Sequence, residues 1–270
     1  MSMRTVAQLS DLSGRAALVT GGAGHVGLAA CDALLELGAS VGILDLDASA
    51  CEQRVAELRR RYPKASLLGV PCDLRDEGAI RRAVKMTIKE LHGLTIVVHS
   101  AAYVGTMKLP GWSAPFEEQT VAAWDEAMRV NVTSAFVIVQ EAQQALAASG
   151  HGSVVLLSSI YGLVGPDLSL YEGTPMTHAG AYDASKGGLN QLARYLATVL
   201  APRIRVNTIS PGGIWRNQPE PFHQRYQART PLGRMATEED LKGAVAYLAS
   251  DLSAYVTGHN LLVDGGWTAW

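Results

Sequence analysis

Seven short apolar runs alternate along the chain with longer segments of helical pattern, and this alternation limits the fold more than any other feature. The runs are continuously apolar, which is typical of strands buried on both faces of a parallel sheet. Their alternation with helices predicts right-handed crossovers and a doubly wound, Rossmann-type α/β fold, a seven-stranded parallel sheet with helices on both faces. The runs occupy residues 15–20, 40–45, 66–71, 94–100, 153–159, 203–210 and 260–264.

Segments with helical pattern separate most of these runs, and they cover residues 27–39, 48–62, 76–93, 120–150 and 180–202. Ser49 and Glu52 have the spacing of a capping box near the start of the second segment. Two stretches, 102–119 and 162–180, fit neither pattern. Because long loops in a compact domain are often functional, both are candidates for contact with a ligand.

The length of 270 residues and an apolar content of 48% suit a single α/β domain that spans residues 1–270. Residues 1–13 precede the first strand as an N-terminal extension, and residues 211–232 form a predicted substrate-loop region. We see no linker, repeat or low-complexity tract in the chain.

Composition argues against several classes of partner. The formal net charge is −2 and no basic stripe is present, so we expect no nucleic-acid binding. No apolar run has the length of a membrane span or the form of a signal peptide, so we expect a cytoplasmic protein. The three cysteines lack metal-type spacing and the histidines are scattered, which predicts buried thiols and no metal site.

The first predicted strand ends in the glycine-rich sequence TGGAGHVG, residues 20–27, and a helix follows. Glycines in such a turn let backbone N–H groups approach a pyrophosphate at a helix N-terminus, although tight packing alone also selects them. Asp45 ends the second strand, 18 residues after Gly27, where a carboxylate can bind both hydroxyls of an adenosine ribose. No Arg or Lys follows Asp45 closely, so a 2′-phosphate would meet repulsion there. The sequence therefore favours NAD over NADP.

Asp73 follows the third strand in the sequence CDLRD. Its carboxylate could accept a hydrogen bond from the adenine amino group, or it could cap the next helix. Sequence alone leaves both interpretations open.

Taken together, these motifs resemble the short-chain dehydrogenase/reductase family, and the resemblance extends from Leu18 to Gly266. It also rests on a Tyr-x-x-x-Lys motif and on the tail YVTGHNLLVDGGW. The resemblance implies an NAD(P)-dependent oxidoreductase that forms a homodimer or homotetramer through the helices carrying Asn131 and Tyr182. The matching positions are Thr20, Gly21, Gly27, Asp45, Asp73, Asn131, Ser159, Tyr182, Lys186, Asn207, Pro211 and Gly212.

The resemblance also implies which residues contact the cofactor. The predicted set is Gly21, Gly22, His25, Val26, Gly27, Asp45, Leu46, Cys72, Asp73, Leu74, Ser100, Ala101, Ala102, Tyr182, Lys186, Pro211, Gly212 and Ile214.

Three positions depart from the family pattern. His25 stands where the family usually has a second glycine in the phosphate turn, so its Cβ must fit beside the helix start. The family's Asn-Asn-Ala-Gly is replaced by His99-Ser100-Ala101-Ala102, and Arg216 replaces a threonine that often contacts the nicotinamide.

Four residues are predicted to carry the chemistry. Tyr182 and Lys186 are four residues apart and therefore share one helix face. A phenol has a pKa near 10, and we expect the ammonium of Lys186 to favour the phenolate and lower that pKa. Family resemblance assigns Lys186 to the nicotinamide ribose, Ser159 to the reacting oxygen and Asn131 to a water that relays protons to the lysine. Tyr182 would then exchange a proton with the alcohol as hydride moves between the alcohol carbon and the nicotinamide.

The substrate prediction rests on two loops. Ser159 and Tyr182 are 23 residues apart, farther than the usual family spacing, so the additional residues must cover the cleft. With the segment after Pro211, this region offers hydroxyl- and anion-binding side chains, of which we predict Asp167, Tyr171, His178, Arg216 and Asn217 as substrate contacts.

A narrower resemblance, to dehydrogenases encoded in bacterial loci for flagellin glycans and other surface sugars, implies a sugar, sugar phosphate or nucleotide sugar. Two alternatives stay open: an NADPH-dependent 3-oxoacyl thioester reductase, against which Asp45 argues, and a non-enzymatic NAD-binding scaffold.

Overall fold

A seven-stranded, all-parallel sheet forms the centre of the computed structural model, which describes residues 3–104 and 109–270. The strand order is β3-β2-β1-β4-β5-β6-β7, which reverses direction between β1 and β4. In a doubly wound sheet, ligands bind at such a switch point, beyond the carboxyl ends of the strands. The strands are β1 Ala16–Thr20, β2 Ser40–Asp45, β3 Leu67–Pro71, β4 Ile96–His99, β5 Gly152–Leu157, β6 Ile204–Pro211 and β7 Asn260–Val263.

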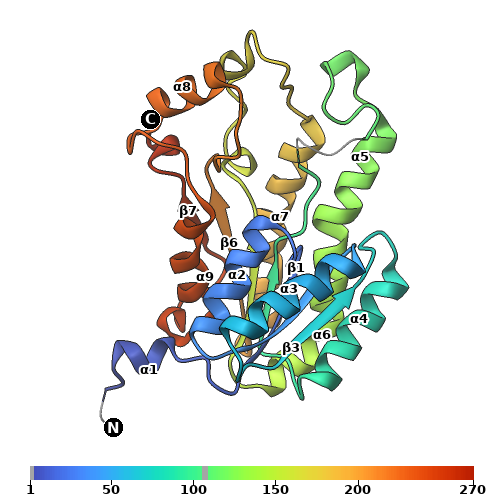
Figure 1. Ribbon diagram of the computed structural model, residues 1–270, viewed down its shortest axis with the longest axis vertical. Helices are drawn as coiled ribbons and strands as arrows, with labels where there is room; N and C mark the ends of the chain where they lie inside the picture. The colour runs from blue at the N-terminus through green and yellow to red at the C-terminus, as the bar shows by residue number, and fades with distance from the viewer. Residues whose placement is uncertain (1–2, 105–108) are drawn as a thin grey trace.

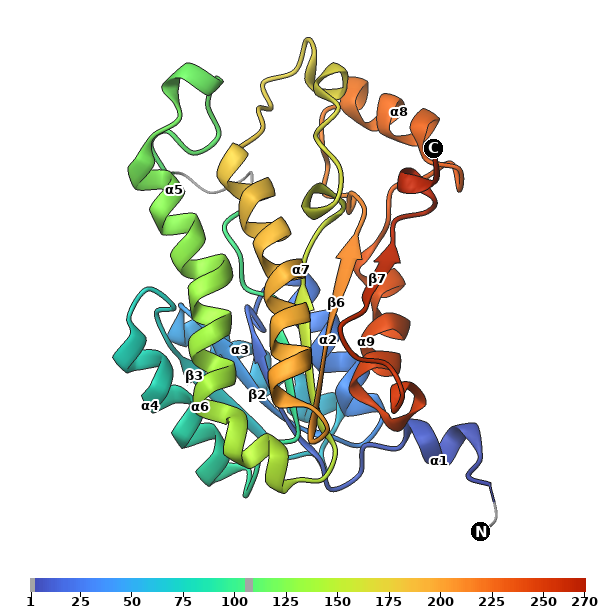
Figure 2. The same ribbon diagram turned by 180° about the vertical axis from the view of Figure 1, so that it is seen from behind.

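Helices cover both faces of this sheet, which confirms the predicted fold. One layer, in front in Figure 1, holds α2 (His25–Glu36), α3 (Ala48–Arg61) and α9 (Lys242–Ala249). The other layer, in front in Figure 2, holds α4 (Glu77–Glu90), α6 (Ser134–Ala148) and α7 (Gly180–Leu200). Each layer packs its own apolar cluster against the sheet, so the strands are buried from both sides as their continuous apolar runs predict.

The predicted helix over residues 120–150 is interrupted. It consists of α5 (Val121–Met128), a π-helical turn over Arg129–Thr133, and then α6. Single π-turns inside helices often mark functional sites, and this one contains Asn131.

Two helices and one cap differ from the sequence prediction. The predicted substrate-loop region contains α8 (Glu220–Arg229), and α9 lies between it and β7. The capping box assigned to Ser49 and Glu52 is wrong, because α3 begins earlier and Asp47 caps it by accepting from the backbone N–H groups of Ser49 and Ala50.

The N-terminal extension contains the short helix α1 (Val6–Ser10), and Arg4 ties it to the body of the protein through a 2.6 Å ion pair with Asp251. Residues 1–2 lie outside the described residues, as do residues 105–108 of the unassigned 102–119 stretch. The described part of that stretch holds one 3₁₀ turn (Phe116–Glu118), and the 162–180 stretch holds another (Leu168–Tyr171).

All three cysteines are buried and free, as predicted. Within the described residues, no helix is both long enough and apolar enough to cross a membrane.

Candidate active site

The glycine-rich turn joins β1 to α2 at the switch point of the sheet. Gly21 has a φ of +63°, and a Cβ on it would lie 2.9 Å from the backbone of Ala101. At Gly27 a Cβ would lie only 2.0 Å from the Gly21 carbonyl oxygen. The helix α2 then starts at His25, and its N-cap residue Gly24 provides no side-chain cap. Its first N–H groups are therefore available for an anion, which fits the pyrophosphate of a dinucleotide.

Asp45 lies beside this turn at the end of β2. Its carboxylate accepts hydrogen bonds from the backbone N–H of Ala23 at 3.0 Å and of Leu46 at 2.8 Å. An anionic side chain held against the phosphate turn suits the two hydroxyls of a ribose and opposes a 2′-phosphate.

The carboxylate of Asp73 pairs with a residue that neither sequence interpretation, adenine contact or helix cap, suggests. Its carboxylate forms an ion pair with Arg75 at 2.6 Å, which lowers the pKa of Asp73 through the hydrogen bonds of the guanidinium. The cap of α4 is Asp76, which accepts from the N–H of Ala79. The helix-cap interpretation of Asp73 is therefore wrong, and an adenine would have to share this carboxylate with Arg75.

The other predicted cofactor residues lie along the same edge of the sheet. Ser100 and Ala101 follow β4 and donate their N–H groups to the Thr20 hydroxyl, both at 3.2 Å. Gly22, Cys72 and Leu74 are buried, and Leu46 is exposed. Val26, Ala102, Pro211, Gly212 and Ile214 are partly exposed at this edge.

Ser159, Tyr182 and Lys186 come together beyond the carboxyl end of β5. Tyr182 and Lys186 lie in the first two turns of α7, and the Lys186 ammonium is 5.5 Å from the centre of the Tyr182 ring. Lys186 is buried, and its Nζ donates a 2.7 Å hydrogen bond to the carbonyl of Leu157, the last residue of β5. Ser159 starts the next 3₁₀ turn and faces the Tyr182 phenol, whereas Ser158 donates to the Lys186 carbonyl.

The electrostatics of the pair differ from the sequence expectation. Burial raises the pKa of Tyr182, although a hydrogen bond with Ser159 acts in the opposite direction. Burial also lowers the pKa of Lys186 to about 7, so its ammonium is only partly populated at neutral pH. The expectation that Lys186 lowers the pKa of Tyr182 is therefore wrong for this structure, in which desolvation of both groups dominates.

Asn131 is fully buried in the π-turn, and its side chain bridges two other segments. Its carboxamide oxygen accepts from the backbone N–H of Tyr103 at 2.8 Å, and its amide group donates to the Ser185 hydroxyl at 2.8 Å. Sequence reasoning missed Tyr103 and Ser185, because contacts between such distant segments leave no local pattern.

Comparison with known proteins decides the family. A family profile described as enoyl-(acyl carrier protein) reductase matches residues 21–268. The chain is 33% identical over 268 residues to the cyclopentanol dehydrogenase of Comamonas testosteroni, which covers 97% of this chain and 100% of that protein. It is also 31% identical over 262 residues to the 2,5-dichloro-2,5-cyclohexadiene-1,4-diol dehydrogenase of Sphingobium indicum, covering 95% and 97% of the two chains. The chain belongs to the short-chain dehydrogenase/reductase family.

A solved structure of this family supports the same assignment. The NADPH-dependent 3-quinuclidinone reductase of Rhodotorula rubra superimposes with a TM-score of 0.86 at 28% identity, covering 100% of this chain and 97% of that one. As a short-chain dehydrogenase/reductase, the protein is an oxidoreductase of CH–OH groups with a nicotinamide cofactor.

Two of the three departures from the family pattern meet at one carboxylate. The exposed His25 ring has its Nδ1 3.8 Å from Oε1 of Glu238, and Arg216 pairs with the same oxygen at 3.1 Å. His25 is therefore directed toward Glu238, and Arg216 is held at the same carboxylate. Glu238 was not predicted, because it becomes a neighbour only through the fold.

The insertion between Ser159 and Tyr182 brings together the rings of Tyr161, Tyr171 and His178, and we call this group the aromatic wall. The Tyr171 hydroxyl is 3.1 Å from Nδ1 of His178, whose Nε2 is 2.6 Å from a carboxylate oxygen of Asp183. The His178 ring lies 4.6 Å from that of Tyr161 and 6.3 Å from that of Tyr182, centre to centre. The predicted contacts Tyr171 and His178 are thus brought next to Tyr182, on a surface that is more aromatic than the sequence suggested.

Two other predicted substrate contacts, Asp167 and Asn217, have surroundings different from those of Tyr171 and His178. Asp167 caps the 3₁₀ turn over Leu168–Tyr171 and pairs with Arg229 of α8, so its carboxylate is already engaged. Asn217 has a φ of +57° in an exposed turn after Arg216. Asp167 therefore anchors the insertion to α8, which does not fit the predicted direct contact.

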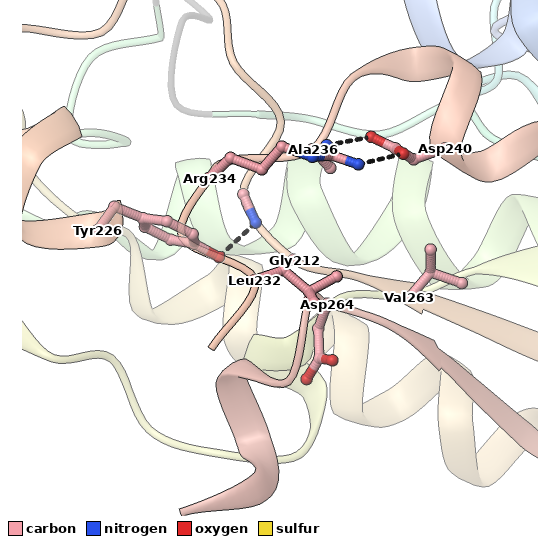
Figure 3. Close-up of a pocket in the computed structure, with 10 residues that line it drawn as sticks. Gly212, Tyr226, Leu232, Arg234, Ala236, Asp240, Val263 and Asp264 are labelled. Atoms are coloured by element: carbon pink, nitrogen blue, oxygen red, sulfur yellow. Dashed lines mark hydrogen bonds and ion pairs between the residues drawn. The ribbon is translucent and has the colours of Figure 1, made fainter. Parts of the chain in front are cut away.

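A cavity of about 120 Å³ lies where β6 and β7 end, beside the 211–232 segment (Figure 3). The Tyr226 hydroxyl accepts from the N–H of Gly213, and Arg234 forms two 2.7 Å hydrogen bonds with Asp240 at its rim. None of the four predicted catalytic residues lines this cavity. The segment is joined to the sheet here, because the N–H of Gly212 donates to the carbonyl of Val263 in β7 at 3.0 Å.

Proposed function

We propose that the protein is an NAD-dependent dehydrogenase that interconverts a ring-bearing secondary alcohol and its ketone, with sugars and sugar derivatives as the first substrate class. The observation that carries the proposal is the meeting of Ser159, Tyr182 and Lys186 beyond the carboxyl end of β5, the edge of the sheet at which Asp45 borders the phosphate turn. Two relatives that act on ring alcohols support it.

The aromatic wall supports the substrate class. The rings of Tyr161, Tyr171 and His178 offer apolar faces to a sugar or other ring, and their polar atoms can meet its hydroxyls. Arg216, which pairs with Glu238 and whose charge acts on Tyr182, would suit a phosphate group of a sugar phosphate.

The residues would divide the work as follows. When bound, the nicotinamide supplies the hydride acceptor. Tyr182 takes the proton of the substrate hydroxyl in oxidation and returns it in reduction. Ser159 donates a hydrogen bond to the reacting oxygen and stabilises charge on it. Lys186, with a pKa of about 7, can pass the proton onward at neutral pH. Asn131 holds the π-turn against the first turns of α7.

The residues fit the pyrophosphate and the adenosine half of the dinucleotide. The uncapped start of α2 would hold the pyrophosphate, and the Asp45 carboxylate would bind the adenosine ribose. We propose NAD because no positive side chain follows Asp45 in the sequence LDLDASA to receive a 2′-phosphate.

A homodimer or homotetramer is part of the proposal. Helices α5, α6 and α7, which carry or flank Asn131 and Tyr182, expose the large apolar side chains Trp124, Phe136, Tyr195 and Val199. Large apolar side chains exposed on these helices would suit a protein–protein interface. The buried, unpaired cysteines suit a reducing compartment, and we propose the cytoplasm.

One alternative has support from a specific observation. The matching family profile carries the description enoyl-(acyl carrier protein) reductase, which favours an acyl thioester as substrate. That function would accompany NADPH, against which Asp45 argues.

Separate fluorescence titrations with NADH and NADPH test the proposal, followed by a screen of ring alcohols, sugars, sugar phosphates and nucleotide sugars with NAD and of a 3-oxoacyl thioester with NADPH. We expect tight NADH binding, weak NADPH binding and turnover within the screen. Preference for NADPH with turnover of a 3-oxoacyl thioester would replace the proposal by the alternative. Dinucleotide binding without any turnover would favour a scaffold.

A further inference from the structure

His99, one of the departures from the family pattern, lies buried at the end of β4 and directly behind the candidate active site. In the register of β1 and β4 it is the partner of Thr20, and only 1% of its surface is exposed. Its Nδ1 is 2.9 Å from the Thr20 hydroxyl oxygen. Its Nε2 is buried and has no hydrogen-bond partner among the described residues. A buried, unpaired ring nitrogen is costly and calls for an explanation.

The hydroxyl of Thr20 fixes the tautomer of His99. A threonine hydroxyl has two acceptor sites and one hydrogen to donate. Thr20 accepts from the backbone N–H groups of Ser100 and Ala101, both at 3.2 Å, so its hydrogen is left for Nδ1 of His99. Since Nδ1 accepts, a neutral His99 ring must carry its proton on Nε2.

The π-turn that holds Asn131 lies beside the His99 ring. The backbone carbonyls of Val130 and Asn131 act on the His99 ring, and the one charged group that acts on it among the described residues is Lys186. Burial lowers the pKa of His99 to about 3, and the Lys186 charge acts in the same direction. The ring is therefore a neutral donor throughout the physiological pH range.

We propose that His99 is a positioning residue, whose Nε2–H is directed at the carbonyls of the π-turn and holds Asn131 in register with Ser185 and Lys186. The Thr20 hydroxyl sets the direction of this donor, so Thr20 and His99 act as one unit. The proposed unit links the end of β1, beside the phosphate turn, to the proton-handling side of the site.

Nitrogen-15 NMR of the histidine rings tests the tautomer directly. His99 is assigned by the loss of its signals in His99→Asn. We expect the Nε2–H tautomer in the wild type, without titration between about pH 5 and 9. Thr20→Val, which lacks the hydroxyl, should shift the tautomer toward Nδ1–H, and the matched Thr20→Ser should not. An Nδ1–H tautomer or an imidazolium in the wild type, or no response to Thr20→Val, would overturn the proposal.

Kinetics test the positioning role, and this arm rests on the proposed dehydrogenase function. His99→Leu lacks a donor and should lower kcat by about tenfold and shift the pH–rate profile, while KM and the Kd for NADH stay unchanged. His99→Asn keeps an N–H donor and should recover most of the loss. Equal effects of Leu and Asn would reject the donor role. If His99→Leu does not fold, Thr20→Val against Thr20→Ser gives the same comparison.

Failure of the kinetic experiment can be told apart from failure of the NMR experiment. Absence of turnover in the wild type would count against the proposed function, whereas the tautomer measurement needs no substrate and judges His99 alone.

Discussion

Asn131 donates a 2.8 Å hydrogen bond to the hydroxyl of Ser185, the residue directly before Lys186. Ser185 in turn donates to the carbonyl of Tyr182 at 2.7 Å. The π-turn of one helix is thereby connected to the first turns of α7, where both proton-handling residues lie. The candidate site thus depends on the relative position of two helices as well as on the residues that face the substrate.

Asn131→Ala should weaken both stability and turnover. The change leaves the buried Tyr103 N–H without its acceptor and should lower the free energy of unfolding by about 1–3 kcal/mol. It should also reduce kcat by about tenfold or more, since the turn of α7 loses its tether. Urea denaturation and steady-state kinetics check the two effects. Wild-type turnover at reduced stability would confine Asn131 to a structural role.

Asp45→Ser should relax the choice of cofactor. Removing one negative charge near the ribose should shift the ratio of the NADPH and NADH dissociation constants toward NADPH by about tenfold or more. Asp47→Ser is the matched control, because Asp47 caps α3 and serine also caps helices well. A ratio that moves equally in both variants would show that Asp45 does not select the cofactor.

Lys186 should make stability depend on pH. Its folded pKa is about 7 against an ordinary value of 10.5, so between these values the unfolded chain binds a proton that the folded chain does not. The wild type should therefore gain stability, relative to Lys186→Met, as pH rises from about 7 toward 10. Denaturant unfolding of both proteins across this range measures the difference. A constant difference would mean that Lys186 stays fully charged in the folded protein.

Gly27 and Gly243 should respond in opposite ways to alanine. A Cβ at Gly27 would lie 2.0 Å from the Gly21 carbonyl oxygen, so Gly27→Ala should distort the phosphate turn and abolish NADH binding. Gly243 lies exposed in α9 with no atom within 4 Å of such a Cβ. Gly243→Ala should therefore stabilise the protein by up to about 1 kcal/mol. Calorimetry and NADH titration of both variants decide, and retained binding in Gly27→Ala would remove the turn from the cofactor site.

The sheet could be predicted because its strands are buried on both faces. Each predicted strand agrees with the observed one within two residues at either end, since a continuous apolar run leaves little freedom. The interruption of the helix over 120–150 was harder to predict, because a π-turn adds one residue to a single turn and hardly disturbs the apolar periodicity. Helix α8 is mostly polar, so its pattern resembles that of a loop.

The site could be predicted only in part. Motifs placed Asp45, Ser159, Tyr182 and Lys186 at strand ends or on one helix face, where local order brings them together. Glu238 and Asp183 were missed, because their importance arises from partners that only the fold brings near. The pKa of Tyr182 was misjudged for a similar reason, since burial cannot be read from a four-residue spacing.

Tyr182→Phe tests the central claim most directly, with NAD and any ring alcohol that the wild type oxidises. Tyr255→Phe is the matched control, because Tyr255 is fully exposed and lies outside the helices of the proposed interface. We predict that Tyr182→Phe loses turnover by at least about a hundredfold with NADH binding nearly intact, while Tyr255→Phe behaves as the wild type. Turnover of Tyr182→Phe above about a hundredth of the wild-type rate would contradict the general-base role on which this account depends.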